Sequence, residues 1–401
     1  MRTALALAAA AVLALAPAAR AESTPQAFDA AVTQILAQPY QPDYVPLGTD
    51  GAFAPALVAN VAPAQDYTSG SIQGSPDAPA WPAWFEPVTI ASGDGAPLLG
   101  FAALHFGTHP AIVVAHGFNT HGRDSVIRWA AMLYANGYDV AAVDQRDFNA
   151  EFQAGYGPPL WRQTFGWKES EDVLAVGRWL RAQPGVSSVG VAGFSEGAQN
   201  TVLALALDAA APTGRRVFDA GLQFSGPSDQ ATQIGIDPAA TNALVTLVVP
   251  PYDYLDACSV LKDAATWYAT TPQGILAHES AYHAVTAIRV PLLGFYAADD
   301  PLVPSWEATM MAAYGAGNPT QRTFVVEKGN HAYFYDRWWQ QRAMLLYFKA
   351  LLPGADKDAT VTTAPTVNRT DGGAPLSSQL VDLGSPSRAD ADALATTYAC
   401  G

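Results

Sequence analysis

The sequence predicts an α/β fold in which a mostly parallel sheet carries helices on both faces. From residue 86 to residue 352, short apolar segments typical of buried strands alternate with segments of helical periodicity. An antiparallel hairpin is expected at the start of this region, because two strand-like segments flank a Gly-Asp-Gly turn at 93–95. The pentapeptide GFSEG at 193–197 separates an expected strand from an expected helix, and its glycines permit a sharp turn there.

The individual elements follow from the apolar pattern. A first helix is expected over 26–36, where Phe28, Val32 and Ile35 share one face. Strands are expected over 87–91, 98–106, 111–115, 138–143, 188–192, 218–224, 290–296 and, as the last one, 323–326. Helices are expected over 124–136, 167–182, 196–208, 306–314 and 332–352.

The alternation stops between residues 225 and 289. A loop of about 65 residues without structure is rare in a compact domain, so helices are expected inside it, over 242–248, 255–268 and 277–287. We interpret residues 226–289 as a cap inserted over the sheet edge, before the strand over 290–296, rather than as a second domain.

The N-terminus is typical of a cleaved signal peptide at 1–21. Arg2 precedes an apolar run over 4–17, and a small-residue cleavage site follows at 19–21. A membrane-spanning helix is the alternative, but the run is short and Arg20 follows it almost at once. The pattern predicts export, to the periplasm or out of the cell.

The segments that flank the predicted domain show little periodicity. Residues 22–85 are expected to form an N-terminal arm, and the Thr-, Pro- and Asp-rich residues 353–401 a loosely held tail. Cys258 lies in the predicted cap and Cys400 in the tail. In an oxidising compartment such a pair suggests a disulfide that ties the tail to the body. The alternative is a buried Cys258 and an unattached Cys400.

The composition excludes several classes of partner. A net charge of −15 argues against nucleic acid and anionic membrane surfaces. Two cysteines offer too few ligands for a metal site, and no CxxC or HExxH motif occurs. We therefore expect no metal and no cofactor.

Four motifs resemble those of α/β-hydrolase-fold serine hydrolases, the esterase- and lipase-like superfamily, and they occur in the same order. They are AHGF at 115–118, GFSEG at 193–197, DDPLVP at 299–304 and GNH at 329–331. The resemblance implies the α/β-hydrolase fold, with the nucleophile, the acid and the base in that order along the chain. The motifs are specific to the superfamily and much less specific to a substrate.

The resemblance also implies a catalytic triad. Ser195 matches the nucleophile, and a serine hydroxyl needs a base to take its proton as it attacks. His331, which follows the last expected strand, matches that base. Asp300 lies four residues before Pro304 of the D-x-x-V-P pattern and matches the acid, whereas Asp299 is expected to be a solvated or turn-capping carboxylate.

An oxyanion hole is expected from the backbone N–H groups of Phe118 and Glu196. His116 is expected to be a turn residue whose ring braces the loop that carries Phe118. The Glu196 side chain departs from the usual motif, and we interpret it as a charge favourable to the helix dipole rather than as a substrate contact. The DQRD stretch at 144–147 resembles a structural motif of the family and is given no chemical role.

Together these features predict an exported serine hydrolase that cleaves a small-molecule carboxylic ester, or a related acyl substrate, through an acyl-enzyme. An acyltransferase or a peptidase with the same triad is one alternative. A peptidase would need acidic cap residues to bind an amine, and Asp253, Asp256 and Glu279 are available. A hydrolase-fold protein that only binds a ligand is the other alternative, which an intact triad disfavours.

Overall fold

A computed structural model provides the structure of the chain. It describes residues 24–38, 83–117, 122–146, 163–232, 257–300, 302–327, 331, 338–352, 375–381, 383 and 386–394. The predicted signal peptide lies outside these residues, as does Cys400. None of the helices in the described ranges is long and apolar enough to cross a membrane.

The described strands form one sheet in the order β1-β2-β4-β3-β5-β6-β7-β8-β9. The sheet is parallel from β4 to β8, and antiparallel pairs join β1, β2 and β4 at one edge and β8 and β9 at the other. The strands are β1 (Glu86–Ala91), β2 (Pro97–Ala103), β3 (His109–Ala115), β4 (Asp139–Val143), β5 (Val186–Phe194), β6 (Ala220–Phe224), β7 (Leu292–Ala297), β8 (Gln321–Val326) and β9 (Leu380–Val381). The predicted α/β architecture is confirmed.

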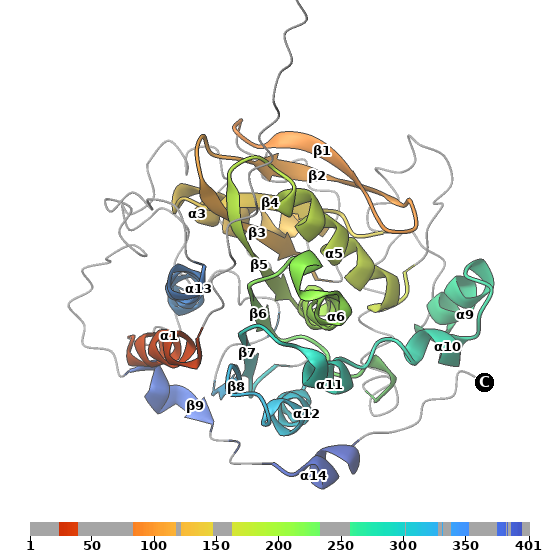
Figure 1. Cartoon of the computed structure of the whole chain (residues 1–401). Coiled ribbons are helices and arrows are strands. Elements are labelled where there is room, and N and C mark those ends of the chain that lie inside the picture. Colours follow the sequence, from red (N-terminus) through yellow and green to blue (C-terminus); the bar gives the residue numbers. More distant parts are fainter. Residues whose placement is uncertain are drawn as a thin grey trace, which may run out of the picture.

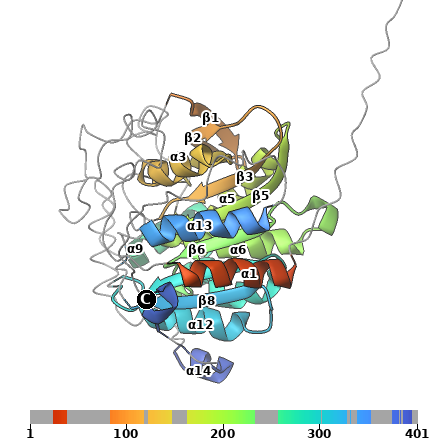
Figure 2. The same cartoon turned by 90° about the vertical axis from the view of Figure 1, so that its left-hand side faces the viewer.

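Helices cover both faces of the sheet (Figures 1 and 2). On one face lie α1 (Pro25–Ala37), α3 (Ile127–Ala135) and α13 (Trp338–Leu351); on the other lie α5 (Trp167–Arg181), α6 (Glu196–Ala210), α11 (Ala281–Ala284) and α12 (Ser305–Gly315). Two hydrophobic cores result, one on each face of the sheet. Successive residues of β5 point to opposite faces, so Phe194 packs in the core under α1, α3 and α13, and Val191 packs in the core under α5, α6 and α12. Burial on both faces explains why the central strands are continuous apolar runs.

The predicted N-terminal arm begins with a helix that belongs to the main core. α1 packs against α13, where the rings of Phe28 and Tyr347 meet edge to face at 6.3 Å between centroids. Gln38, which caps α1, donates from Nε2 to the carbonyl of Trp339 at 2.9 Å. The arm therefore starts as part of the helical layer that Figure 2 shows in front of the sheet.

The predicted cap insertion divides into two parts. The helices α9 (Ala257–Trp267) and α10 (Pro272–Leu276) share a small core of their own with Phe165, beyond the α5–α6 layer (Figure 1). α11 and the following 3-10 turn instead pack on α6 and α12 and belong to the main domain. The expected helix over 242–248 falls outside the described residues, and a cap over the sheet edge stays a prediction.

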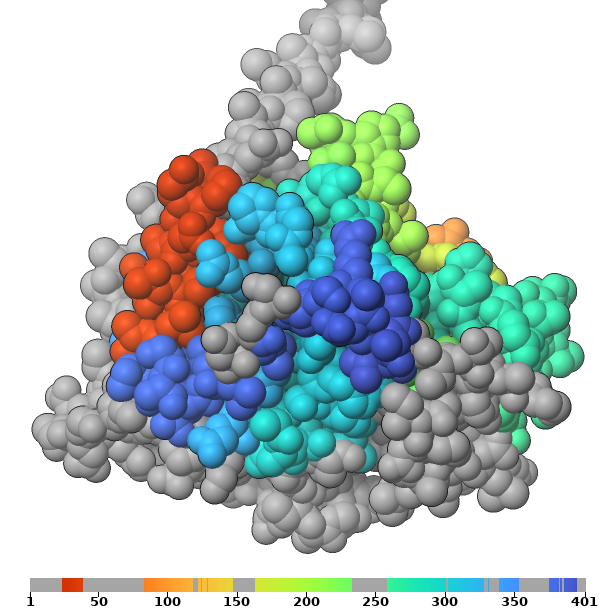
Figure 3. Space-filling model, turned by 90° about the horizontal axis from the view of Figure 1, so that it is seen from below, coloured from red at the N-terminus to blue at the C-terminus, as the bar shows by residue number. Residues whose placement is uncertain are grey.

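The C-terminal segment contains a strand that the sequence did not predict. β9 pairs with β8, with Val381 opposite Val325, so the strand over 323–326 is not the last one. The 3-10 turn before β9 (Leu376–Gln379) packs beside α1, and the short helix α14 (Arg388–Asp392) lies on α12 (Figure 3). Two residues without periodicity gave no strand signal, because β9 is specified by its pairing partner rather than by its own pattern.

Candidate active site

Ser195 occupies the sharp turn between β5 and α6. Its backbone has φ 54° and ψ −128°, and its N–H donates to the carbonyl of Phe224 at 2.9 Å. A Cβ at Gly193 would overlap the carbonyl of Gly197, and a Cβ at Gly197 would overlap the carbonyl of His116. Both glycines are required because three backbone segments meet at this turn.

The structure brings the three predicted triad residues together. The Ser195 hydroxyl lies 2.8 Å from Nε2 of His331, and Nδ1 of His331 lies 2.8 Å from a carboxylate oxygen of Asp300. His331 and Asp300 are each 8% exposed, whereas Ser195 is partly exposed. Ser195 therefore keeps some contact with solvent, while the two groups behind it are nearly shielded from water.

Asp300 rather than Asp299 faces the imidazole. The second carboxylate oxygen of Asp300 accepts the backbone N–H groups of Leu302 and Val303, each at 2.8 Å. These two bonds fix the rotamer that presents the other oxygen to His331. Asp299 is exposed, as expected for a solvated or turn-capping carboxylate.

The loop at 116–117 packs directly on Ser195. A Cβ added to Gly117 would lie 2.8 Å from the Cβ of Ser195. Nε2 of His116 accepts the backbone N–H of Gln145 at 3.0 Å, so the ring proton is on Nδ1, which donates to the carbonyl of Gly117 at 2.8 Å. Burial lowers the pKa of His116 to about 4. A neutral His116 thus braces this loop. Phe118 lies outside the described residues.

The backbone of Glu196 fits its expected role, but its side chain does not. As the first residue of α6 its backbone N–H has no acceptor within the helix, which fits an oxyanion donor. Its side chain, however, is 2% exposed and bonded by Gln163 Nε2. Burial, reinforced by the neighbouring charge of Glu169, raises the pKa of Glu196 well above its usual range. The side chain is thus buried beneath the segment ahead of α5, and its raised pKa disfavours the charge that the sequence interpretation assumed at the helix terminus.

Several buried polar residues near Ser195 were missed. On α6, Gln199 and Asn200 are fully buried and bonded to other elements. Their signal in the sequence is a run of polar residues in a helix that is otherwise apolar. Arg146, from the stretch given no chemical role, is buried and bonds Asp172 through Nε at 3.0 Å and Asp94 through Nη1 at 2.7 Å. It joins the hairpin turn to α5.

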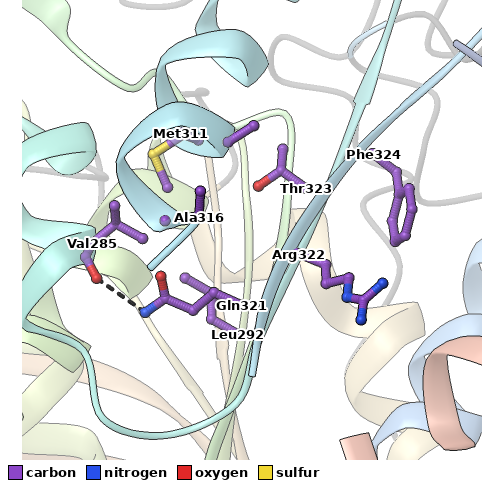
Figure 4. Close-up of a pocket in the computed structure, with 10 residues that line it drawn as sticks. Val285, Leu292, Met311, Ala316, Gln321, Arg322, Thr323 and Phe324 are labelled. Atoms are coloured by element: carbon purple, nitrogen blue, oxygen red, sulfur yellow. Dashed lines mark hydrogen bonds between the residues drawn. The ribbon is translucent and has the colours of Figure 1, made fainter. Parts of the chain in front are cut away.

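A separate cavity of about 110 Å³ lies between α12 and the start of β8 (Figure 4). Leu292 and Gln321 are the first residues of β7 and β8, so the cavity lies at the opposite end of the strands from Ser195. Gln321 spans it and donates from Nε2 to the carbonyl of Val285 at 3.0 Å. The cavity contains none of the site residues predicted from the sequence. It is lined by Val285, Leu292, Met311, Ala312, Gly315, Ala316, Gln321, Arg322, Thr323 and Phe324.

No family model matches the sequence, and comparison with curated proteins found no relative. Solved structures with a similar arrangement include an esterase from Pyrococcus furiosus, at 20% identity, covering 67% of this chain and 93% of that one, with a TM-score of 0.47. An acylaminoacyl peptidase from Pyrococcus horikoshii matches at 20% identity over 69% and 44%, with a TM-score of 0.47. A puromycin-hydrolysing peptidase from Mycobacterium tuberculosis matches at 17% identity over 67% and 39%, with a TM-score of 0.48.

Neither these identities nor these TM-scores are high enough to carry an activity from those proteins to this chain. The chain's own topology is more informative. Its strand order, with a serine on the turn between β5 and α6 and a histidine after β8, is the α/β-hydrolase fold that its motifs predict.

Proposed function

We propose that this protein is a serine hydrolase that cleaves carboxylic esters of small molecules. The observation that supports it is the hydrogen-bonded series from Ser195 through His331 to Asp300, with 2.8 Å at each step. This geometry is what nucleophilic catalysis by serine needs, because the base must reach the hydroxyl and a third group must hold the base.

In the proposed reaction Ser195 attacks the acyl carbon as His331 takes the hydroxyl proton. Asp300 holds the ring and stabilises the imidazolium that forms. The N–H groups of Glu196 and Phe118 stabilise the negative oxygen of the tetrahedral intermediate. His331 then protonates the leaving alcohol, and water, activated by the same imidazole, releases the acyl group from Ser195. No cofactor takes part.

Labelling by a fluorophosphonate probe tests the assignment. Wild type should be labelled and should hydrolyse short p-nitrophenyl esters, whereas Ser195→Ala should do neither while keeping its circular dichroism spectrum. Ser187→Ala is a suitable control, since that partly buried serine lies at the other end of β5. Undiminished labelling of folded Ser195→Ala would exclude Ser195 as the nucleophile.

An acyltransferase or a peptidase with the same triad is the second candidate. Of the acidic residues that could bind a peptide amine, Asp253 and Asp256 lie outside the described residues. Glu279 is fully buried and accepts the N–H of Ala231 at 2.8 Å, which favours a structural role for it. Product analysis with an ester and an aminoacyl amide, each with and without added alcohol, distinguishes hydrolysis from transfer and from peptidase activity.

We further propose that the protein is exported and that a disulfide joins Cys258 to Cys400. Cys258 lies in the first turn of α9, is partly buried and packs against the small core that α9 shares with α10. A bond to Cys400 would close a loop of about 142 residues, for which chain entropy gives at most ~5 kcal/mol. Peptide mapping of exported protein under non-reducing conditions tests the disulfide, because two unmodified thiols in fresh material would rule the bond out.

N-terminal sequencing of the same exported protein tests the cleavage of the signal peptide, and the sequence should begin at Glu22.

A further inference from the structure

Gln145, a buried residue after β4, forms two hydrogen bonds with the loop at 116–117. Its backbone N–H donates to Nε2 of His116 at 3.0 Å, and its side-chain Nε2 donates to the backbone carbonyl of the same histidine at 2.9 Å. Gln145 belongs to the stretch at 144–147, for which the sequence indicates no chemical role. It nevertheless bonds both the ring and the backbone of the residue that braces this loop.

The backbone groups fix the direction of these bonds. A backbone N–H only donates, so Nε2 of His116 accepts and the ring proton is on Nδ1. A backbone carbonyl only accepts, so Gln145 presents its NH₂ group to His116 and has its oxygen free for another donor. That oxygen accepts Nδ2 of the buried Asn200 at 2.5 Å. The helix that follows Ser195, α6, therefore anchors the Gln145 side chain.

The ring of His116 in turn holds one peptide group. Its Nδ1–H donates to the carbonyl of Gly117 at 2.8 Å. That carbonyl shares a planar peptide group with the N–H of Phe118, and in a trans peptide the two point in opposite directions. A hydrogen bond that fixes the direction of the carbonyl therefore also fixes the direction of the N–H, which is the proposed oxyanion donor. The same bond polarises the peptide group and makes its N–H a stronger donor.

Packing sets the closest approach of this loop to Ser195 but not the direction of its peptide groups. A Cβ on Gly197 would lie 2.2 Å from the His116 carbonyl oxygen, and a Cβ on Gly117 would lie 3.4 Å from Oγ of Ser195. Such contacts prevent a closer approach, whereas a hydrogen bond favours one alignment of its donor and acceptor. The bonds from Gln145 and from the His116 ring therefore supply the orientation that packing alone does not.

We propose that Gln145 is a positioning residue for the oxyanion hole. Its backbone N–H selects the tautomer of His116 and its side chain holds the loop, so that His116 orients the peptide group between Gly117 and Phe118. The inference rests on the proposed function, because an oriented N–H matters where negative charge develops on an acyl oxygen. Burial of His116 supports it, since a pKa lowered to about 4 keeps the ring neutral, with one accepting and one donating nitrogen.

The rate constant of fluorophosphonate labelling tests the proposal on the full chain, because the phosphonyl oxygen of the probe needs the same N–H groups as an acyl oxygen. Gln145→Met removes the side-chain bonds and keeps the backbone N–H. It should be labelled roughly ten-fold more slowly than wild type, less than the ~100-fold typical of losing a donor outright. Asn200→Ala removes only the anchor of Gln145, so it should slow labelling by a smaller factor, and it serves as the test if Gln145→Met does not fold.

Gln321→Met is the matched control and should be labelled at the wild-type rate. Its amide also donates to a backbone carbonyl, at 3.0 Å, but lies at the opposite end of the strands from Ser195. Wild-type rates for both Gln145→Met and Asn200→Ala, or an equal loss in the control, overturn the proposal while the proposed function stands. Wild type that is not labelled at all overturns the proposed function, and the inference with it.

Steady-state ester hydrolysis separates positioning from a loss of folded protein. In Gln145→Met kcat should fall roughly ten-fold at nearly constant KM, because the lost interaction is made in the transition state. The affinity for a trifluoromethyl ketone, whose adduct with Ser195 carries an oxyanion, should fall by the same factor. Partial misfolding would also lower kcat, but it would leave the ketone affinity of the remaining active molecules unchanged. A lower kcat with unchanged ketone affinity therefore overturns the proposal.

Discussion

Asp300 and Glu307 lie seven residues apart after β7, and both are buried, yet their surroundings treat them in opposite ways. Asp300 accepts two backbone N–H groups on one oxygen and faces the imidazole of His331 with the other. Glu307, in the first turn of α12, accepts the N–H and hydroxyl of Ser228 on one oxygen, and its other oxygen has no partner among the described residues. Burial raises the pKa of Glu307 to about 8.

The difference shows that the distribution of partners over the two oxygens, and not depth alone, decides what a buried carboxylate can do. A carboxylate with donors on both oxygens can stay ionised and stabilise a cation beside it. A buried carboxyl group with one oxygen that accepts no hydrogen bond is more stable in its protonated, neutral form. The proposed catalytic acid is therefore recognised by the N–H groups of Leu302 and Val303 as much as by its contact with His331.

The largest effect is expected from breaking the Asp300–His331 contact. Asp300→Asn should lower kcat by roughly 10⁴-fold, because the amide no longer holds the correct ring tautomer or stabilises the imidazolium. Asp299→Asn is the matched control one residue away and should change kcat by less than about two-fold, since that side chain is exposed. Esterase kinetics on both variants measure this. If Asp299→Asn proved the damaging change, the assignment of Asp300 as the catalytic acid would be refuted.

A third buried carboxylate, Asp172, has a guanidinium for its partner. Arg146→Met should destabilise the chain by about 3–5 kcal/mol, because it leaves Asp172 buried without its cation. Urea denaturation measures the free energy of unfolding. Exchanging both residues, as Arg146→Met/Asp172→Leu, should recover much of the loss, and a double variant as unstable as the single one would argue against charge as the cause.

Glu307→Gln should change how stability depends on pH. Because the folded pKa is raised from 4.5 to about 8, the folded chain keeps a proton that the unfolded chain releases, so stability is full below pH 4.5 and declines as pH rises toward 8. This group contributes a slope of about 1.4 kcal/mol per pH unit within that window. The variant should show a correspondingly flatter fall of Tm than wild type, and parallel curves would mean that Glu307 is ionised when folded.

The smallest effect belongs to a carboxylate that is not buried. Asp29 on α1 pairs with Arg322 on β8 at 2.8 Å, and both side chains are about half exposed. Asp29→Asn should cost less than about 1 kcal/mol, and 0.5 M salt should remove much of the difference. Thermal melts at low and high salt measure both. A cost comparable with that of Arg146→Met would mean that exposure does not weaken this pair.

The strands, and the meeting of Ser195, Asp300 and His331 at one site, could be predicted because the sequence carries local signals for both. A strand buried on both faces is a continuous apolar run, as at 111–115, and β3 has these residues at its end. Ser195, Asp300 and His331 each follow a strand at its C-terminal end, so a correct strand order suffices to bring them to one edge of the sheet.

The burial and raised pKa of Glu196 could not be predicted because they depend on contacts distant in sequence. Gln163, which bonds the Glu196 carboxyl, precedes α5, and no spacing in the chain relates the two residues. For the same reason β9 could not be predicted, because it is two residues long and is specified only by its pairing with β8. Local patterns predict elements, whereas the partners of a buried polar atom depend on which elements meet.

The backbone of Ser195 has a consequence for the stability of the whole chain. Its φ of 54° with ψ of −128° is a combination that glycine adopts readily and other residues do not. Each folded molecule therefore holds roughly 1–3 kcal/mol of conformational strain at Ser195, the proposed nucleophile. Ser195→Gly would relieve that strain, against about 0.5–1 kcal/mol for the freedom of glycine in the unfolded chain. The hydroxyl proposed to react is thus kept at a cost in the stability of the folded chain.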